Sequence, residues 1–445
     1  MSRARRVAFL IVLGVPVFCC LGSALFVMSA GGRAKAAAAN EEVLARKAGM
    51  PLEYSDLHLS HFPDAQNAAG LYRSLGKQLK TDYSKPLKLI TTALARKATD
   101  AEIQAGRDAL DDLKPLYGSI TELDARTGCD FNRDWSKGPA LLFPEFADMK
   151  ALVKYLTFRA DAVDLKSDPA GALKSMDYSN RIALDSGSDP VLIGMLVQIA
   201  CRMISDREFE HLISHHTRDG KFLAEVGAMI DRQSRLPDPR KYLGGEIVFE
   251  RQTLKMLSNL RDLQTDQGVY SDQPSQPSAF QRSFLQSPIV QGNLEAKLLS
   301  AWRKGWSQFP QDPSDWATFH VALKQMDDAV QNDHSLANIG NQILFPVLSQ
   351  SADAVGNLQA HDRLLQTSIA LLKLRLETGK LPAALPSSLG DIRLDPFDGN
   401  PLRYKKQGGG FLLYSIGRDR VDNGGHKRTA DDTTNEGTDE VIEFK

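Results

Sequence analysis

The chain has 445 residues, a formal net charge of −1, 42% apolar side chains and 24% charged ones. This composition is that of a folded protein with a hydrophobic core, and the length suits two or three domains, so a disordered chain is excluded. Lys and Arg are dispersed beyond the first few residues, which gives no electrostatic surface for nucleic acid, and we expect no nucleic-acid partner.

Residues 7–30 carry no charged side chain. An apolar stretch of about 20 residues crosses the hydrocarbon core of a bilayer as a helix. This stretch also exceeds the apolar region of a cleavable signal peptide, which is about 7–15 residues long. We therefore predict a retained transmembrane anchor that contacts membrane lipid, with cleavage after Ala30 as the alternative.

The charges around this span predict its orientation. Three arginines lie within residues 1–6, whereas two cations follow the span, Arg33 and Lys35. Positive charge favours the cytoplasmic side of a membrane. We expect residues 1–6 to form a cytoplasmic tail and the bulk of the chain to be extracytoplasmic, in the periplasm.

Four cysteines divide between two settings. Cys19 and Cys20 fall inside the span and are interpreted as small apolar residues of a membrane helix. Cys129 and Cys201 lie outside the span, where an oxidising compartment permits a disulfide. The sequence does not set their separation, so two buried free thiols are the alternative.

Residues 31–63 begin with small side chains and are predicted to be a flexible linker, and residues 64–378 have the apolar periodicity of helices. A Gln-, Ser- and Pro-rich stretch over about residues 265–292 predicts a flexible loop. Helices are expected around residues 65–82, 99–125, 151–163, 171–185, 191–204, 205–216, 218–232, 240–263, 290–307, 315–333 and 353–378. We predict an extracytoplasmic helical bundle or a helical-repeat-like array, although no second copy of a repeat is found.

Two of these helices have specific signals. Asp189-Pro190 suits the N-cap and first turn of an apolar helix over residues 191–204, which is too short to span a membrane and contains Arg202. Such a helix is typical of a bundle core. Gly379 suits the C-cap of the helix that ends near residue 378.

Residues 379–445 change character. A turn signal at Asp395-Pro-Phe-Asp-Gly-Asn precedes a strand signal, Lys405-Lys-Gln-Gly-Gly-Gly predicts a hairpin loop, and Phe411-Leu-Leu-Tyr-Ser-Ile-Gly predicts the returning strand. The tail beyond Arg418 is rich in acidic residues. We therefore expect a small C-terminal antiparallel β-module with an acidic tail.

The series Thr378-Gly-Lys-Leu-Pro, Asp395-Pro-Phe-Asp-Gly-Asn-Pro-Leu-Arg-Tyr and Tyr414-Ser-Ile-Gly-Arg-Asp resembles the C-terminal half of the major pseudopilins of type II secretion. The resemblance covers about residues 365–432. The whole chain, including the segment Arg126 to Gly138, also resembles uncharacterised single-pass bacterial envelope proteins with a long helical region. The chain departs from pseudopilins at its N-terminal end, which lacks their processing site and their single continuous helix.

In the pseudopilins the final loop binds calcium. The resemblance implies that Asp419 is a ligand, with Asp431 or Asp432 matching a later acidic pair, and Asp422 lies in the same loop. Carboxylates and loop carbonyls supply the oxygens that Ca²⁺ prefers. Arg420 stands where the family has a glycine, which puts the metal in doubt. A solvated acidic tail without a cofactor is the alternative.

The rest of the chain contains no recognisable nucleophile, metal or phosphate motif, so no catalytic residue is assigned. His211 and His215 share a helix face with Glu208 but lack a third zinc ligand by spacing. Glu246 and Glu250 are interpreted as a solvated helix face. His58 and His61 have no partner that the sequence reveals, and the aromatic content of 7% argues against a stacking surface for carbohydrate.

The sequence thus predicts a mainly α-helical, membrane-anchored envelope protein. Abundant helical surface without a catalytic motif favours non-enzymatic binding of a protein partner, or scaffolding. An envelope hydrolase without a recognisable motif is one alternative. An accessory component of a secretion or pilus-type system, based on the tail alone, is another.

Overall fold

The computed structural model describes residues 29–95, 97–234, 236–258, 286–332, 348–427 and 437–445. In these ranges the fold is mainly helical, as predicted, with a three-stranded antiparallel sheet at the C-terminus. After a first helix over residues 29–47 the elements are η1 (Tyr54–Leu57), α2 (Ala69–Thr81), α3 (Ser84–Ala93), α4 (Asp100–Asp108), α5 (Lys114–Ile120), η2 (Thr121–Ala125), η3 (Trp135–Ala140), α6 (Glu145–Asp164), α7 (Pro169–Ser186), α8 (Leu192–His215), α9 (Gly220–Gln233), α10 (Pro239–Ser258), α12 (Pro288–Trp306), α13 (Trp316–Gln331), α15 (Ser349–Thr378), η6 (Ser387–Arg393), β1 (Arg403–Gln407), β2 (Gly410–Ser415) and β3 (Glu440–Phe444).

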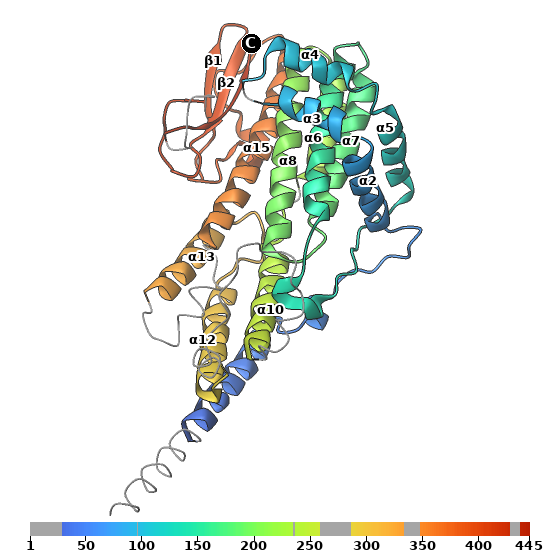
Figure 1. The fold of residues 1–445 in the computed structure, drawn as a ribbon. Coiled ribbons are helices and arrows are strands. Elements are labelled where there is room, and N and C mark those ends of the chain that lie inside the picture. The colour runs from blue at the N-terminus through green and yellow to red at the C-terminus, as the bar shows by residue number, and fades with distance from the viewer. Residues whose placement is uncertain (1–28, 96, 235, 259–285, 333–347, 428–436) are drawn as a thin grey trace, which may run out of the picture.

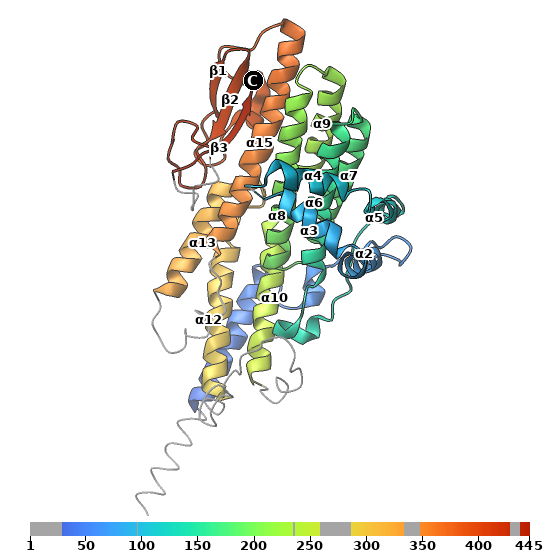
Figure 2. The same ribbon diagram turned by 45° about the horizontal axis from the view of Figure 1, so that its top comes forward.

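The molecule is elongated (Figures 1 and 2). The helices α8, α10 and α15 run along its length. The helix over residues 29–47 lies at one end, beside α10 and α12, and the sheet lies against α15 toward the other end. The described chain therefore begins and finishes at opposite ends of a helical rod.

The helix over residues 29–47 corrects the prediction of a flexible linker from residue 31. Its small residues are packed, with Ala34, Ala38 and Ala45 all buried. A Cβ added at Gly292 of α12 would lie 2.6–2.8 Å from backbone atoms of Ala34 and Lys35, so the two helices approach closely here. Alanine has the highest helix propensity, and small side chains permit such close contact.

Ion pairs hold the same helix in place. Arg303 of α12 donates to Glu41 at 2.9 Å, and the buried Arg251 of α10 donates to Glu42 at 2.6 Å.

Most of the predicted anchor, residues 7–28, lies outside the described residues. Among the helices of the described ranges, none is both long and apolar enough to cross a membrane.

Most predicted helices are confirmed within a few residues, but several interpretations are wrong. The stretch 99–125, predicted as one helix, divides into α4, α5 and η2. The stretches 191–204 and 205–216 form one continuous helix, α8, whose N-cap is Val191. Asp189 does not cap it, because the Asp189 carboxylate accepts hydrogen bonds from Arg133 instead. Residues 288–292, predicted to lie in the flexible loop, begin α12, and residues 265–285 of that loop lie outside the described ranges. Gly379 ends α15 with a φ of 75°, as predicted.

Buried side chains form three clusters along the rod. The first joins residues 45–52 to α10, α12, α13 and the start of α15. The second lies among α2, α3, α5, α6 and α7. The third joins α8, α9 and α15 to the sheet. Because burial of apolar area stabilises a fold, the sheet and the helical rod depend on each other.

The sheet has the order β1-β2-β3 with antiparallel pairing, and Tyr404 pairs with Leu413, which pairs with Ile442. Leu413 and Ile442 are fully buried in the third cluster, together with Phe411 and Phe444. The C-terminal β-module is therefore one side of a shared core, packed on α15.

A buried ion pair links α8 to α15 at the centre of the rod. One terminal nitrogen of Arg202 donates to both carboxylate oxygens of Asp362 at 2.8 Å, and Gln233 of α9 donates to Asp206 at 3.0 Å. The sequence predicted that Arg202 lies on a buried helix, and Arg202 is only 1% exposed. Removing one partner of such a pair would leave an uncompensated buried charge and lower the stability of the fold. These bonds therefore favour the packing in which these faces of α8, α9 and α15 meet.

Candidate functional site

A polar cleft of about 350 Å³ lies between two loop segments that are far apart in the sequence. One segment covers residues 54–61, which includes η1, and the other covers residues 130–135, which leads into η3. The lining residues are Tyr54, Ser55, His58, Leu59, His61, Asp130, Asn132, Arg133 and Trp135. The second segment belongs to the sequence stretch Arg126 to Gly138 that stood out in the sequence, so we regard this cleft as the candidate functional site.

His61 is paired with Asp130 at the mouth of the cleft. The distance between His61 Nδ1 and Asp130 Oδ2 is 2.7 Å. The imidazole is 73% exposed, while the carboxylate is 18% exposed. In the neutral imidazole with Nδ1 donating to the carboxylate, Nε2 is a hydrogen-bond acceptor. No local pattern in the sequence indicated this partner, which lies 69 residues away.

Asp130 is itself held by its neighbours. Asn67 Nδ2 donates to the Asp130 carbonyl at 2.8 Å, and the Asp130 amide donates to Asn67 Oδ1 at 3.0 Å. The other oxygen of the Asp130 carboxylate accepts the Asn132 amide at 2.7 Å. This last bond supports the left-handed backbone of Asn132, whose φ is 47°. The backbone of Asn132 is therefore held in place, and its exposed side chain lies at the rim of the cleft.

A buried ion network forms the base of the site. The Arg133 side chain is 6% exposed and donates to Glu145 at 2.8 Å and to Asp189 at 2.9 Å. Its guanidinium also lies over the Phe131 ring, 4.5 Å from the ring centre. Burial raises the pKa of Asp189, and the Arg133 hydrogen bond opposes that rise. The positive charge of Arg133 is thus neutralised by carboxylates of the protein itself.

An aromatic pair lines one side of the cleft. Tyr54 and Trp135 stack with ring centres 4.8 Å apart and an interplanar angle of 23°. The Tyr54 hydroxyl is buried and has no hydrogen-bond partner among the described residues. Burial and the negative charge of Glu246 raise the pKa of Tyr54 well above its usual range. Tyr54 therefore stays a neutral, planar side chain at physiological pH.

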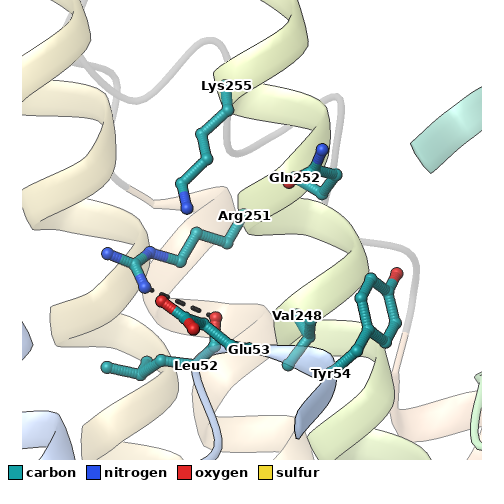
Figure 3. Close-up of a pocket in the computed structure, with 7 residues that line it drawn as sticks. All are labelled: Leu52, Glu53, Tyr54, Val248, Arg251, Gln252 and Lys255. Carbon is teal, nitrogen blue, oxygen red and sulfur yellow. Dashed lines mark hydrogen bonds between the residues drawn. The ribbon is translucent and has the colours of Figure 1, made fainter. Parts of the chain in front are cut away.

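A smaller hollow of about 220 Å³, which Tyr54 also lines, lies against α10 (Figure 3). Arg251 reaches across it toward the chain before η1 and donates to the Leu52 carbonyl at 3.4 Å. The same guanidinium is paired with Glu42 and with Glu295, at 2.6 and 3.0 Å. This hollow is a junction of structural ion pairs, whereas the larger cleft presents exposed polar side chains.

Glu246 and Glu250, predicted to form a solvated face, are half-buried and buried, respectively, in α10. Glu246 accepts the Leu192 amide at 3.1 Å, and Glu250 accepts the indole N–H of Trp302 at 2.6 Å. Burial raises the pKa of both carboxyls, and for Glu250 the nearby Glu246 adds to the rise. Their spacing of four residues marked a shared helix face but not which way that face points.

The histidines at the end of α8 bond carboxylates of α6, and the rings of His211 and His215 also contact each other, with centres 4.4 Å apart. His211 bonds Asp161 at 3.0 Å, and His215 and His216 bond the two oxygens of Asp164 at 2.9 and 2.7 Å. Among the described residues, no group of three or more His, Cys, Asp or Glu side chains is arranged to hold a metal ion. The described geometry therefore does not supply the missing third zinc ligand.

Two of the four predicted calcium ligands can be placed. Asp419 accepts the amides of Val421 and Gly437 at 3.1 and 3.3 Å. Asp422 accepts the Gly424 amide and the Tyr414 hydroxyl at 2.9 and 3.1 Å. The other two, Asp431 and Asp432, lie outside the described residues. Both described carboxylates accept hydrogen bonds from protein donors, and the calcium site stays a prediction.

Arg420, the residue that departs from the pseudopilin pattern, has a structural role. Its φ of 57° is the left-handed conformation that a glycine adopts readily. Its guanidinium lies over the Trp316 ring of α13, 5.0 Å from the ring centre. The loop therefore docks on the helical rod through Arg420.

Cys129 and Cys201 are free, buried thiols, so of the two possibilities that the sequence left open, the free thiols are confirmed and the disulfide is not formed. Both belong to the second core cluster. Burial raises the pKa of Cys201 to about 12, and that of Cys129 also rises. Because the thiolate is the reactive form, both cysteines are core residues rather than nucleophiles.

Comparisons with models of known protein families, with characterised proteins and with solved structures found no match to this chain. The resemblance of residues 365–432 to pseudopilins stays a prediction from the motifs. The geometry of the cleft and of the rod is thus the basis for a functional proposal.

Proposed function

We propose that this protein is a membrane-anchored, extracytoplasmic binding protein of the cell envelope, without a catalytic step of its own. The observation that supports it is the arrangement of the rod. Residues 29–47, which follow most of the predicted anchor in the sequence, are helical and are locked to α10 and α12 by close packing and ion pairs. The sheet shares its core with the opposite part of the rod.

This arrangement suits a rigid spacer. A flexible linker lets a domain sample many distances from the membrane, whereas a helix packed into the body transmits a fixed orientation. The rod would hold the cleft and the C-terminal β-module at set positions relative to the bilayer. Partner binding by a rigid, preorganised surface avoids the entropy cost of ordering a flexible one.

The test is the orientation of the chain in intact cells. Gly409 lies at the tip of the β1–β2 hairpin, and a side chain added there meets nothing within 4 Å. In a Gly409→Cys variant we expect labelling by a membrane-impermeant maleimide once the outer barrier is opened. A Ser2→Cys control is expected to stay protected until detergent is added. The native Cys129 and Cys201 are buried and give little background. The reverse pattern of labelling would refute the proposal.

A hydrolase is the second candidate, and the His61–Asp130 pair is what favours it. An exposed imidazole oriented by a carboxylate is the base half of many hydrolytic sites. A hydrolase also requires a nucleophile or an activated water near Nε2. Turnover of an ester, amide or glycoside by the purified chain that is lost in His61→Ala would favour this candidate over binding. A secretion-system accessory role depends on the tail resemblance alone.

A further inference from the structure

We propose that the cleft between residues 54–61 and 130–135 binds a neutral pyranose sugar, which stacks near the Tyr54–Trp135 pair and bonds His61 and Asn132. This inference deepens the proposed binding function and names its ligand class. It depends on the proposed function only for the expectation that the cleft faces an extracytoplasmic glycan or sugar.

The charges around the cleft argue against an ionic ligand. The Arg133 cation is only 6% exposed and is satisfied by Glu145 and Asp189. Both Asp130 oxygens already accept hydrogen bonds, one from His61 and one from the Asn132 amide. A phosphate or carboxylate ligand needs an available cation, and an ammonium ligand needs an available carboxylate. Among the described lining residues, the one Arg is paired with two carboxylates and the one Asp already accepts two donors, which leaves His58 and His61 as the basic side chains at the surface.

The exposed polar groups instead match hydroxyls. The Asn132 side chain offers both a donor and an acceptor, and the Ser55 hydroxyl does the same. His61 adds an acceptor at Nε2 when Nδ1 donates to Asp130. Each sugar hydroxyl is a donor and an acceptor at once, so a mixed neutral lining satisfies several hydroxyls. His61 is held by its bond to Asp130, which limits the entropy that this side chain loses on binding.

The size and shape of the cleft agree with one sugar ring. Its volume of about 350 Å³ is near the lower end of ligand pockets, which is about 300–1,000 Å³. Tyr54 and Trp135 place aromatic surface beside the polar side chains. A pyranose has an apolar face of C–H groups and a rim of hydroxyls, so it complements a lining that combines both.

The experiment uses the full chain in lipid nanodiscs, because glycosidic detergents would compete for the site. The probes are N-acetylglucosamine, its tetramer and cellotetraose, with inorganic phosphate and tetramethylammonium as charged probes. Of the four tryptophans, Trp302, Trp306 and Trp316 are buried. A saturable change in tryptophan fluorescence on adding a sugar therefore reports on Trp135, and calorimetry measures the same binding independently.

Two variants remove the bonding groups with little effect on the fold. His61→Ala removes an exposed side chain, and Asn132→Gly removes the amide while keeping a residue that favours a positive φ. Each is expected to weaken sugar binding about threefold to tenfold, the effect of one neutral hydrogen bond. His426→Ala, an exposed histidine of the C-terminal module, is the matched control and should bind like the wild type.

Saturable sugar binding that is weakened in both variants would support the proposal. Tighter binding of a tetramer than of the monosaccharide would identify the ligand as part of a glycan chain, and equal binding would identify a free sugar. The proposal is overturned if no sugar binds at millimolar concentration, if only a charged probe binds, or if the two variants bind sugar unchanged. Because the purified chain is used, such a failure leaves the membrane orientation test unaffected.

Discussion

At the scale of single residues, burial and packing set the roles of acidic and aromatic side chains. Glu246 is half-buried and Glu250 is buried in α10, and burial raises the pKa of both carboxyls. The overall aromatic content of 7% argued against a stacking surface, yet folding brings Tyr54 and Trp135 together beside polar groups. Composition is an average over the whole chain, so it does not show whether two particular aromatic side chains meet.

Arg420 allows a test of backbone strain against a tertiary contact. Arg420→Ala keeps a side chain in the left-handed region and loses the contact with Trp316, so it should destabilise the fold by about 1–2 kcal/mol. Arg420→Gly loses the same contact but relieves the strain, so it should be about 1 kcal/mol more stable than the alanine variant. Denaturant unfolding followed by circular dichroism measures both. Equal stability of the two variants would contradict a strained Arg420.

Glu208 predicts a dependence of stability on pH. Burial raises its pKa to about 8, the negative charges of Asp161 and Asp164 contribute, and His211 opposes the rise. A carboxyl whose pKa is raised on folding stabilises the fold below its unfolded pKa, and that stability is lost as pH rises through the folded value.

Glu208→Gln removes this titration. Relative to the wild type, the variant should therefore gain stability between about pH 4.5 and pH 8, by about 1–3 kcal/mol in total. Unfolding free energies at pH 5, 6, 7 and 8 provide the comparison. Glu122→Gln, at an exposed position, is the control and should follow the wild-type profile. A Glu208→Gln profile parallel to the wild type would show that Glu208 titrates normally.

At the scale of elements, local periodicity predicted most helices because a buried face repeats every few residues. It failed where one element depends on another. The helix over residues 29–47 has small residues that suggested a linker, and its partner α12 lies some 250 residues along the chain. The break predicted near residue 204 is absent because α8 continues across the core between α7 and α15.

Gly292 tests this helix contact. In Gly292→Ala the new Cβ would meet backbone atoms of Ala34 and Lys35 at 2.6–2.8 Å, which cannot yield as a flexible side chain would. We expect a loss of about 1–3 kcal/mol and faster proteolysis between residue 30 and residue 50. Gly32→Ala is the control, because its Cβ meets nothing within 4 Å; it should be neutral or stabilising by up to about 1 kcal/mol. Similar behaviour of both variants would argue against the close packing of the two helices.

At the scale of the whole molecule, the β-module and the rod form a continuous body. The fully buried Phe411, Leu413 and Ile442 of the sheet share a cluster with Leu364 and Leu372 of α15. Both faces are apolar, and neither is covered without the other. A module recognised by its sequence motifs need not be an independent folding unit.

Removing residues 380–445 should therefore expose the apolar face of α15. We expect aggregation, or a thermal midpoint lowered by more than about 5 °C, since each fully buried apolar side chain contributes about 1.5–3 kcal/mol. Differential scanning calorimetry of the truncated chain measures the change, with removal of the exposed Lys445 alone as the control. A soluble truncated chain with an unchanged midpoint would mean that the rod folds by itself.

The sequence alone determined the features that depend on neighbouring residues. The helical class, most helix positions, the C-cap at Gly379 and the hairpin at residues 405–410 were all predicted, because periodicity and turn chemistry act within a few residues. The tertiary structure decided the pairs that meet across the chain. His61 meets Asp130 over 69 residues, Arg202 meets Asp362 over 160, and Arg251 meets Glu42 over 209. Such encounters depend on how the helices pack, and no local pattern of the chain encodes them.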